Sequence, residues 1–115
     1  MRHHGLLLSR LTGELVAWCL TGGAEDVDSN IRRMPKGWEI FVKAVFPAGS
    51  RPAAERLARL LASPRSAGTD EYYWNLYGSD DAVFQLGLVG AMTDESDVRF
   101  DEETGRLTIR LLRAD

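Results

Sequence analysis

The stretch that most clearly predicts the fold is VRFDEETGRLTIRL, residues 98–111. Apolar and polar residues alternate in Val98–Phe100 and again in Leu107–Leu111, which is the period of a half-buried β-strand. The loop between them, 101–105, is polar and ends in Gly105, which tolerates the positive φ that such a loop requires. The stretch therefore predicts a β-hairpin near the end of the chain.

The N-terminal part repeats this pattern. Thr12-Gly13-Glu14-Leu15 matches Thr104-Gly105-Arg106-Leu107, and apolar runs flank both segments. We therefore predict a second hairpin with strands at 5–11 and 14–20. The alternative is one helix, with Leu7, Leu11, Leu15 and Trp18 on one face. Glycine in the middle of a helix costs about 1 kcal/mol relative to alanine, and this favours the hairpin.

The middle of the chain predicts a strand followed by a helix. Trp38–Phe46 is rich in β-formers and largely apolar on both faces, which indicates a central strand covered on both sides. Before it, Gly and Pro residues at 21–37 leave room for a short helix within Ala24–Met34. The clearest helix is 51–62, with Pro52 in its first turn. Its expected buried stripe is Ala54, Leu57, Ala58, Leu60 and Leu61.

Residues 70–92 predict a further hairpin. Tyr72–Tyr77 is aromatic and alternating, 78–81 has the composition of a turn, and Val83–Val89 is the expected return strand. A helix beginning at Ser79 is the alternative.

These elements predict an α+β fold. We expect a mostly antiparallel sheet of five to seven short strands, with one helix (about residues 51–62) packed on one face. The 115 residues fit a single domain that spans the chain.

The expected compartment of the protein follows from its single cysteine and from the apolar run near its N-terminus. A lone Cys19 cannot form an intrachain disulfide, and the run at 6–20 is interrupted too often for a signal core or a membrane span. We expect a soluble cytoplasmic protein without membrane contact, with Cys19 as a small buried hydrophobic residue.

The sequence predicts no catalytic residue, no cofactor and no metal, so we expect a protein that is not an enzyme. Both histidines, His3 and His4, lie at the terminus, and no nucleophile elbow or phosphate-binding glycine motif is present. The acidic stretch that starts at Asp26 resembles a calcium loop only at its first positions. Ile31 and Gly37 replace the glycine and the glutamate that such a loop requires.

Direct nucleic-acid binding is not expected either. Lys36–Lys43 partly resembles the aromatic strand motif of RNA-recognition domains, but Glu39 and Ile40 replace the small residue and the stacking aromatic. The acidic second half of the chain would also repel phosphates.

Charge is unevenly distributed along the chain. Residues 1–69 carry ten Lys/Arg and six Asp/Glu, whereas residues 70–115 carry four Arg and eleven Asp/Glu. The acidic residues fall in predicted loops, and alternate loops of a hairpin stack lie at one end of a sheet. The aromatic strand would expose tyrosines, which are enriched at protein interfaces. The expected partner-binding residues are Tyr73, Tyr77, Asp80, Asp81, Asp101, Glu102 and Glu103.

The sequence thus favours a small acidic binding protein that masks a basic surface of a protein partner. Inhibitors and immunity proteins directed at a nuclease or a bacterial defence complex have this build, so the partner could itself be a nucleic-acid-binding protein. One alternative is a small-molecule-binding domain or small enzyme with a pocket between sheet and helix. Another is a salt-sensitive homodimer or structural module that self-associates.

Overall fold

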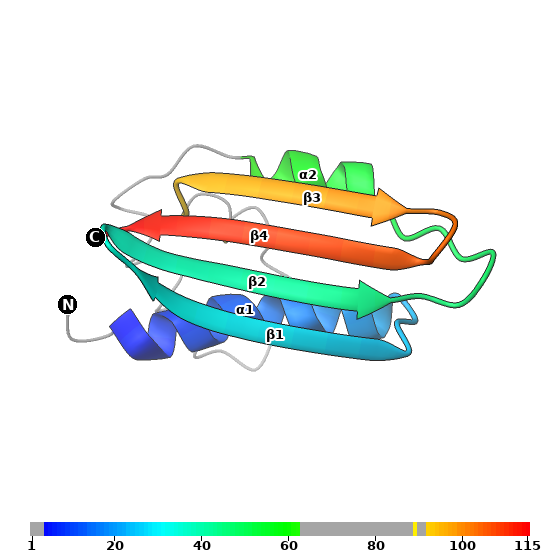
Figure 1. The fold of residues 1–115 in the computed structure, drawn as a ribbon, viewed down its shortest axis with the longest axis horizontal. Coiled ribbons are helices and arrows are strands. Elements are labelled where there is room, and N and C mark those ends of the chain that lie inside the picture. The colour runs from blue at the N-terminus through cyan, green and yellow to red at the C-terminus, as the bar shows by residue number, and fades with distance from the viewer. Residues whose placement is uncertain (1–3, 63–88, 90–91) are drawn as a thin grey trace, which may run out of the picture.

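The computed structural model describes residues 4–62, 89 and 92–115. The elements in chain order are α1 (His4–Thr21), β1 (Asp26–Met34), β2 (Gly37–Val45), α2 (Ala54–Leu61), β3 (Glu95–Asp101) and β4 (Arg106–Ala114). The strands form one antiparallel sheet in the order β1-β2-β4-β3. Both helices lie on the same face of this sheet (Figure 1).

The α+β class and the antiparallel sheet are confirmed. The described residues contain four strands, so the expected five to seven are not confirmed. The predicted strand Tyr72–Tyr77 lies outside the described residues. Of the predicted strand Val83–Val89 only Val89 is described; it is buried and has helical backbone, in agreement with the helical alternative at that residue.

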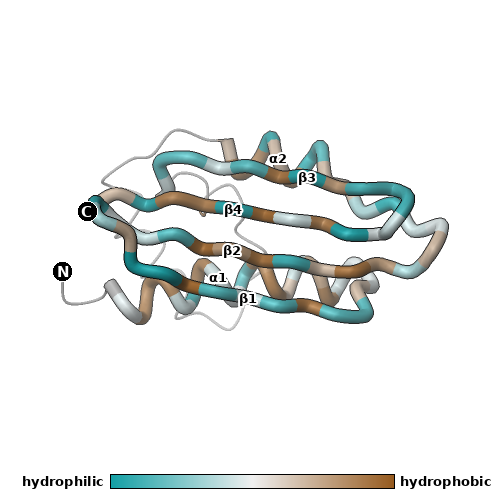
Figure 2. Tube along the Cα trace, in the orientation of Figure 1, coloured by the Kyte–Doolittle hydropathy of each residue, from teal (hydrophilic) through white to brown (hydrophobic). Residues whose placement is uncertain are grey.

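The core is built on the two central strands. Ile40, Val42 and Ala44 of β2 are buried and lie opposite Leu111, Ile109 and Leu107 of β4, respectively. Apolar residues recur at every second position because successive side chains of a strand point to opposite faces. Figure 2 shows this alternation along β2 and β4, whereas β1 is mainly hydrophilic.

The predicted N-terminal hairpin is wrong, because residues 4–21 form the helix α1. Leu7, Leu11 and Leu15 are buried against the sheet, as the helical alternative requires. Gly13 is exposed, and the space around it is open. Burying one leucine stabilises by about 1.5–3 kcal/mol, so three buried leucines outweigh the roughly 1 kcal/mol cost of a helical glycine.

The predicted short helix within Ala24–Met34 is also wrong, because this segment is the strand β1. Most of its side chains are exposed, so its own apolar pattern gives little indication of a strand. It is held by main-chain pairing with β2, in which Met34 lies opposite Gly37 across a two-residue turn. Gly37 lies so close to β4 that a Cβ there would be 2.2 Å from the Arg113 carbonyl oxygen.

The other two sequence predictions in this region hold. The strand predicted at Trp38–Phe46 is β2, and the helix predicted at 51–62 is α2, although α2 begins at Ala54. Leu57 and Leu61 of its expected stripe are buried, but Leu60 is 36% exposed and does not belong to the core.

The C-terminal hairpin is confirmed as β3 and β4. Val98 and Phe100 face the helix side and pack on the core. Gly105 has φ +73°, as a loop of this kind requires.

Candidate protein-binding surface

One end of the sheet collects acidic side chains from both of its edges. The strand register places Asp26, Val45, Arg106 and Asp101 in one row across the sheet. The turn that follows Asp101 extends beyond this row, at the right in Figure 1. We call this region the acidic end, and its exposed members are Glu25, Asp26, Asp101, Glu102 and Glu103.

Two main-chain hydrogen bonds and one bond to a side-chain carboxylate hold the β3–β4 turn in place. The Asp101 carboxylate accepts from the Glu103 N–H at 2.9 Å, and the Gly105 N–H donates to the Asp101 carbonyl at 2.9 Å. The Phe46 N–H donates in turn to the Gly105 carbonyl at 2.8 Å. Asp101 therefore has a structural role in the turn, whereas Glu102 and Glu103 are presented to solvent on a fixed backbone.

Two arginines balance part of this charge. Arg51 pairs with Glu102 at 3.7 Å, and the two side chains are 79% and 65% exposed. An ion pair this exposed contributes little and is easily exchanged for another partner. Arg106 lies opposite Asp101 in the register. The five acidic residues outnumber the two arginines, so the end keeps a negative excess.

The structure brings together part of the predicted site. Asp101, Glu102 and Glu103 lie at one turn, as expected, whereas Tyr73, Tyr77, Asp80 and Asp81 lie outside the described residues. Sequence reasoning missed Glu25 and Asp26 as members of this end. Their signal is an acidic pair just after Gly22-Gly23, but it has meaning only once 26–34 is known to be a strand.

The sheet face opposite the helices carries ion pairs. Among the described elements, no helix covers this face, so the expectation that β2 is covered on both sides is not confirmed (Figure 1). Glu39 lies on this face between two arginines. Its carboxylate accepts from Arg32 at 3.0 Å and from Arg110 at 2.7 Å, and its side chain is only 8% exposed.

The ion-paired pattern continues on the neighbouring strands. Asp97 pairs with Arg99 at 2.9 Å on β3, and the Lys43 ammonium lies 5.3 Å from the centre of the Phe41 ring on β2. Positive and negative groups therefore alternate on this face. The local negative excess is found at the acidic end of the sheet.

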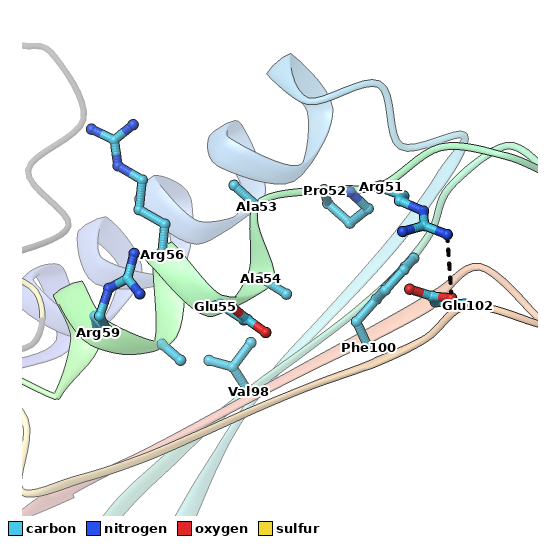
Figure 3. Close-up of a pocket in the computed structure, with 11 residues that line it drawn as sticks. Arg51, Pro52, Ala53, Ala54, Glu55, Arg56, Arg59, Val98, Phe100 and Glu102 are labelled. Atoms are coloured by element: carbon cyan, nitrogen blue, oxygen red, sulfur yellow. Dashed lines mark ion pairs between the residues drawn. The ribbon is translucent and has the colours of Figure 1, made fainter.

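A groove of about 560 Å³ lies between α2 and β3 (Figure 3). Val98 and Phe100 give it an apolar floor, and its charged lining residues are Arg51, Glu55, Arg56, Arg59 and Glu102. Figure 3 shows Arg51 turned toward Glu102 at one end, with Arg56 and Arg59 projecting from α2 at the other. Such a lining could hold a small anion with an apolar part. This is where the alternative of a pocket between sheet and helix would place a ligand.

Metal ligation and thiol chemistry find little support in the described part of the chain. Within it, no three His, Cys, Asp or Glu side chains are grouped so that they could hold a metal ion. Cys19 is buried in the core, as expected, and desolvation raises the pKa of its thiol to about 11. None of the described helices is long and apolar enough to cross a membrane.

Cys19 is expected to react slowly in the folded protein. Raising the thiol pKa from 9.0 to about 11 lowers the thiolate fraction at pH 8 about a hundredfold, and the thiolate is the nucleophile. Labelling by iodoacetamide, followed by mass spectrometry at pH 8, checks this. The same chain in urea serves as the control and is expected to react at the rate of a free thiol; equal rates in the two states would contradict the buried position.

No family model matches the chain, and neither do the curated proteins or the solved structures with which it was compared. A functional proposal therefore has to stand on the surface chemistry of the chain itself.

Proposed function

We propose that the protein is a small, acidic, non-enzymatic binding protein that masks a basic surface of a protein partner. The observation that carries the proposal is the acidic end, where Glu102 and Glu103 project from a turn fixed by hydrogen bonds of the main chain and of the Asp101 carboxylate. A rigid turn loses little conformational entropy on binding, so its charges are already arranged for a partner. Inhibitors and immunity proteins of this type block a nuclease or a bacterial defence complex.

The partner is expected to present Lys and Arg side chains in a patch that spans the width of the sheet. Carboxylates at both edges, Asp26 on one side and Asp101 on the other, frame that width. Complementary charge accelerates association and makes it depend on salt. Glu102 can exchange Arg51 for a basic side chain of the partner, because the ion pair between Glu102 and Arg51 is long and exposed.

The test is capture of a partner from the native host at low salt, followed by affinity measurement with matched variants. Glu102→Lys/Glu103→Lys removes the presented charges and leaves Asp101 in its structural role. We expect at least about tenfold weaker binding and a smaller salt dependence, since local charge reversal at an interface affects both. Arg51 loses its ion pair with Glu102 in this variant, so stability is measured in parallel.

The control is Glu95→Lys/Asp97→Lys, which changes the net charge equally at two exposed positions in the first half of β3 and likewise breaks one exposed ion pair, that between Asp97 and Arg99. It is expected to bind as the unmodified protein does. If both double variants bind the partner equally well, or if capture recovers no basic protein, the proposal is wrong.

A further inference from the structure

The outer edge of β1 has main-chain groups that no described strand pairs with. The Phe46 N–H donates to the Gly105 carbonyl, and the Asp115 N–H donates to the Lys36 carbonyl. Lys36 and Phe46 flank β2 on its two ends, so the even-numbered residues of β2 bond to β4. In an antiparallel sheet the bonding direction alternates along a strand, and the odd-numbered residues of β2 therefore bond to β1.

The register then identifies the groups at the free edge. Odd-numbered residues of β2 lie opposite even-numbered residues of β1. The remaining residues of β1 direct their N–H and C=O groups outward, away from β2. These residues are Val27, Ser29, Ile31 and Arg33.

Charge along β1 is segregated in a way that suits a second copy of the same strand. Asp26 and Asp28 lie in its first half, and Arg32 and Arg33 lie in its second half. Charges on an edge strand usually prevent pairing with another chain. Here an antiparallel copy could place Asp26 opposite Arg32 and Glu25 opposite Arg33, whereas Asp28 would lie opposite the uncharged Asn30. We propose that β1 pairs antiparallel with β1 of a second copy, with Ser29 opposite Ser29 on the two-fold axis.

This register also pairs the apolar residues. With Ser29 at the centre, Val27 lies opposite Ile31 of the second copy, and Asp26 lies opposite Arg32 of the second copy. Ile31 is 36% exposed in the single chain and becomes covered. Hydrogen bonding requires outward-facing residues to lie opposite one another, so the nearest other registers are centred on Asp28, which would place two carboxylates opposite each other, and on Asn30. The register centred on Asn30 places Ile31 opposite Ser29 and loses the apolar pairs.

The helix side of β1 leaves room for this pairing. Ser29, Ile31 and Arg33 point to the face that α1 and α2 cover, and yet all three are exposed. The second copy extends the sheet beyond β1, whereas β3 and its turn lie at the other edge. Glu102 and Glu103 therefore remain accessible. Asp26, in contrast, would be engaged by Arg32 of the second copy, so the Glu102→Lys/Glu103→Lys variant tests partner binding and the β1 variants test the dimer.

Disulfide trapping tests the register. A pair of outward-bonding residues that face each other has Cα atoms about 5.5 Å apart, which suits a disulfide. We expect Ser29→Cys to form an interchain disulfide under mild oxidation, with Asn30→Cys and the exposed Ser9→Cys on α1 as controls that crosslink at least about tenfold more slowly. Cys19 is buried and gives little background.

Sedimentation of the unmodified chain from low- to high-micromolar concentration tests the dimer itself. We expect a dimer that weakens about tenfold between low and high salt, because its ion pairs are screened. Ser29→Pro removes one outward N–H and no bond to β2, and is expected to give a monomer. Ser96→Pro, at the corresponding position on β3, serves as its control and is expected to dimerise. A chain that remains monomeric, a dimer unaffected by Ser29→Pro, or preferential trapping through Asn30→Cys would overturn the proposal.

Discussion

Gly105→Ala is expected to lower the free energy of unfolding by about 3 kcal/mol, for two additive reasons. Gly105 has φ +73°, a conformation that costs an L-residue about 1–2 kcal/mol. A Cβ there would also lie 2.4 Å from the carbonyl oxygen of Phe46, which is backbone and cannot turn aside. Forcing atoms into a filled site costs typically about 1–3 kcal/mol.

Relieving this contact would shift the Phe46 backbone and so disturb the core. Phe46 is buried and meets Phe100 edge to face, with ring centres 6.3 Å apart. Its N–H donates to Gly105, so the turn cannot move without moving this aromatic pair. The variant is therefore expected to loosen the end of the sheet where the acidic turn is attached.

Urea unfolding measures the effect, with Gly49→Ala as the matched control. Gly49 also has a positive φ, +84°, but a Cβ there meets no atom within 4 Å. Its substitution isolates the backbone strain and is expected to cost only about 1–2 kcal/mol. If the two variants lose the same stability, the close contact between Gly105 and Phe46 is not a real constraint.

Ile109→Ala is expected to lower the free energy of unfolding by about 3–4 kcal/mol, within the range for large apolar residues truncated in a core. Ile109 lies in the middle of β4, between Val42 of β2 and Val98 of β3, and is completely buried. Strands on both sides and helices beneath limit how far the surroundings can collapse into the cavity. The loss combines the transfer of the removed methyl groups with the cavity that they leave.

The neighbouring position provides the control. Thr108 precedes Ile109 on the same strand but points to the face without helices and is only half-buried. Thr108→Ala is expected to cost less than about 1 kcal/mol, the span of β-propensity in a host protein. Urea unfolding followed by circular dichroism compares the two, and a loss below about 1 kcal/mol for Ile109→Ala would contradict its place in the core.

The hairpin of β3 and β4 shows which kind of information is local. Strict alternation over Leu107–Leu111 and a glycine at the end of a five-residue loop are enough to predict it, because both signals act within the segment. The same Thr-Gly-x-Leu pattern at Gly13 misled the prediction for α1. An isolated glycine fits a loop or a solvent-facing helix position equally well, and only burial of Leu7, Leu11 and Leu15 distinguishes the two.

The candidate site also has a part that the local sequence predicts and a part that depends on strand pairing. The acidic turn at 101–103 is predictable because its residues are adjacent in the chain. Glu25 and Asp26 join it only through the register of four strands, and β1 was missed because its stability comes from pairing with β2 rather than from its own pattern. The predicted contributions of Tyr73, Tyr77, Asp80 and Asp81 stay predictions.

By itself, the sequence determined the features that depend on neighbours in the chain: the period of two in β2 and β4, the turn at Gly105, the amphipathic stripe of α2 and the segregation of charge. Tertiary structure alone decided which apolar segment became a helix, which polar segment became an edge strand, and which charges met. Glu39 illustrates the reason. Its carboxylate is bonded by Arg32 of β1 and by Arg110, which is 71 residues away and is placed beside it by the pairing of β2 with β4. Such a contact leaves no trace in the sequence around either residue, since its free energy exists only once the sheet has formed.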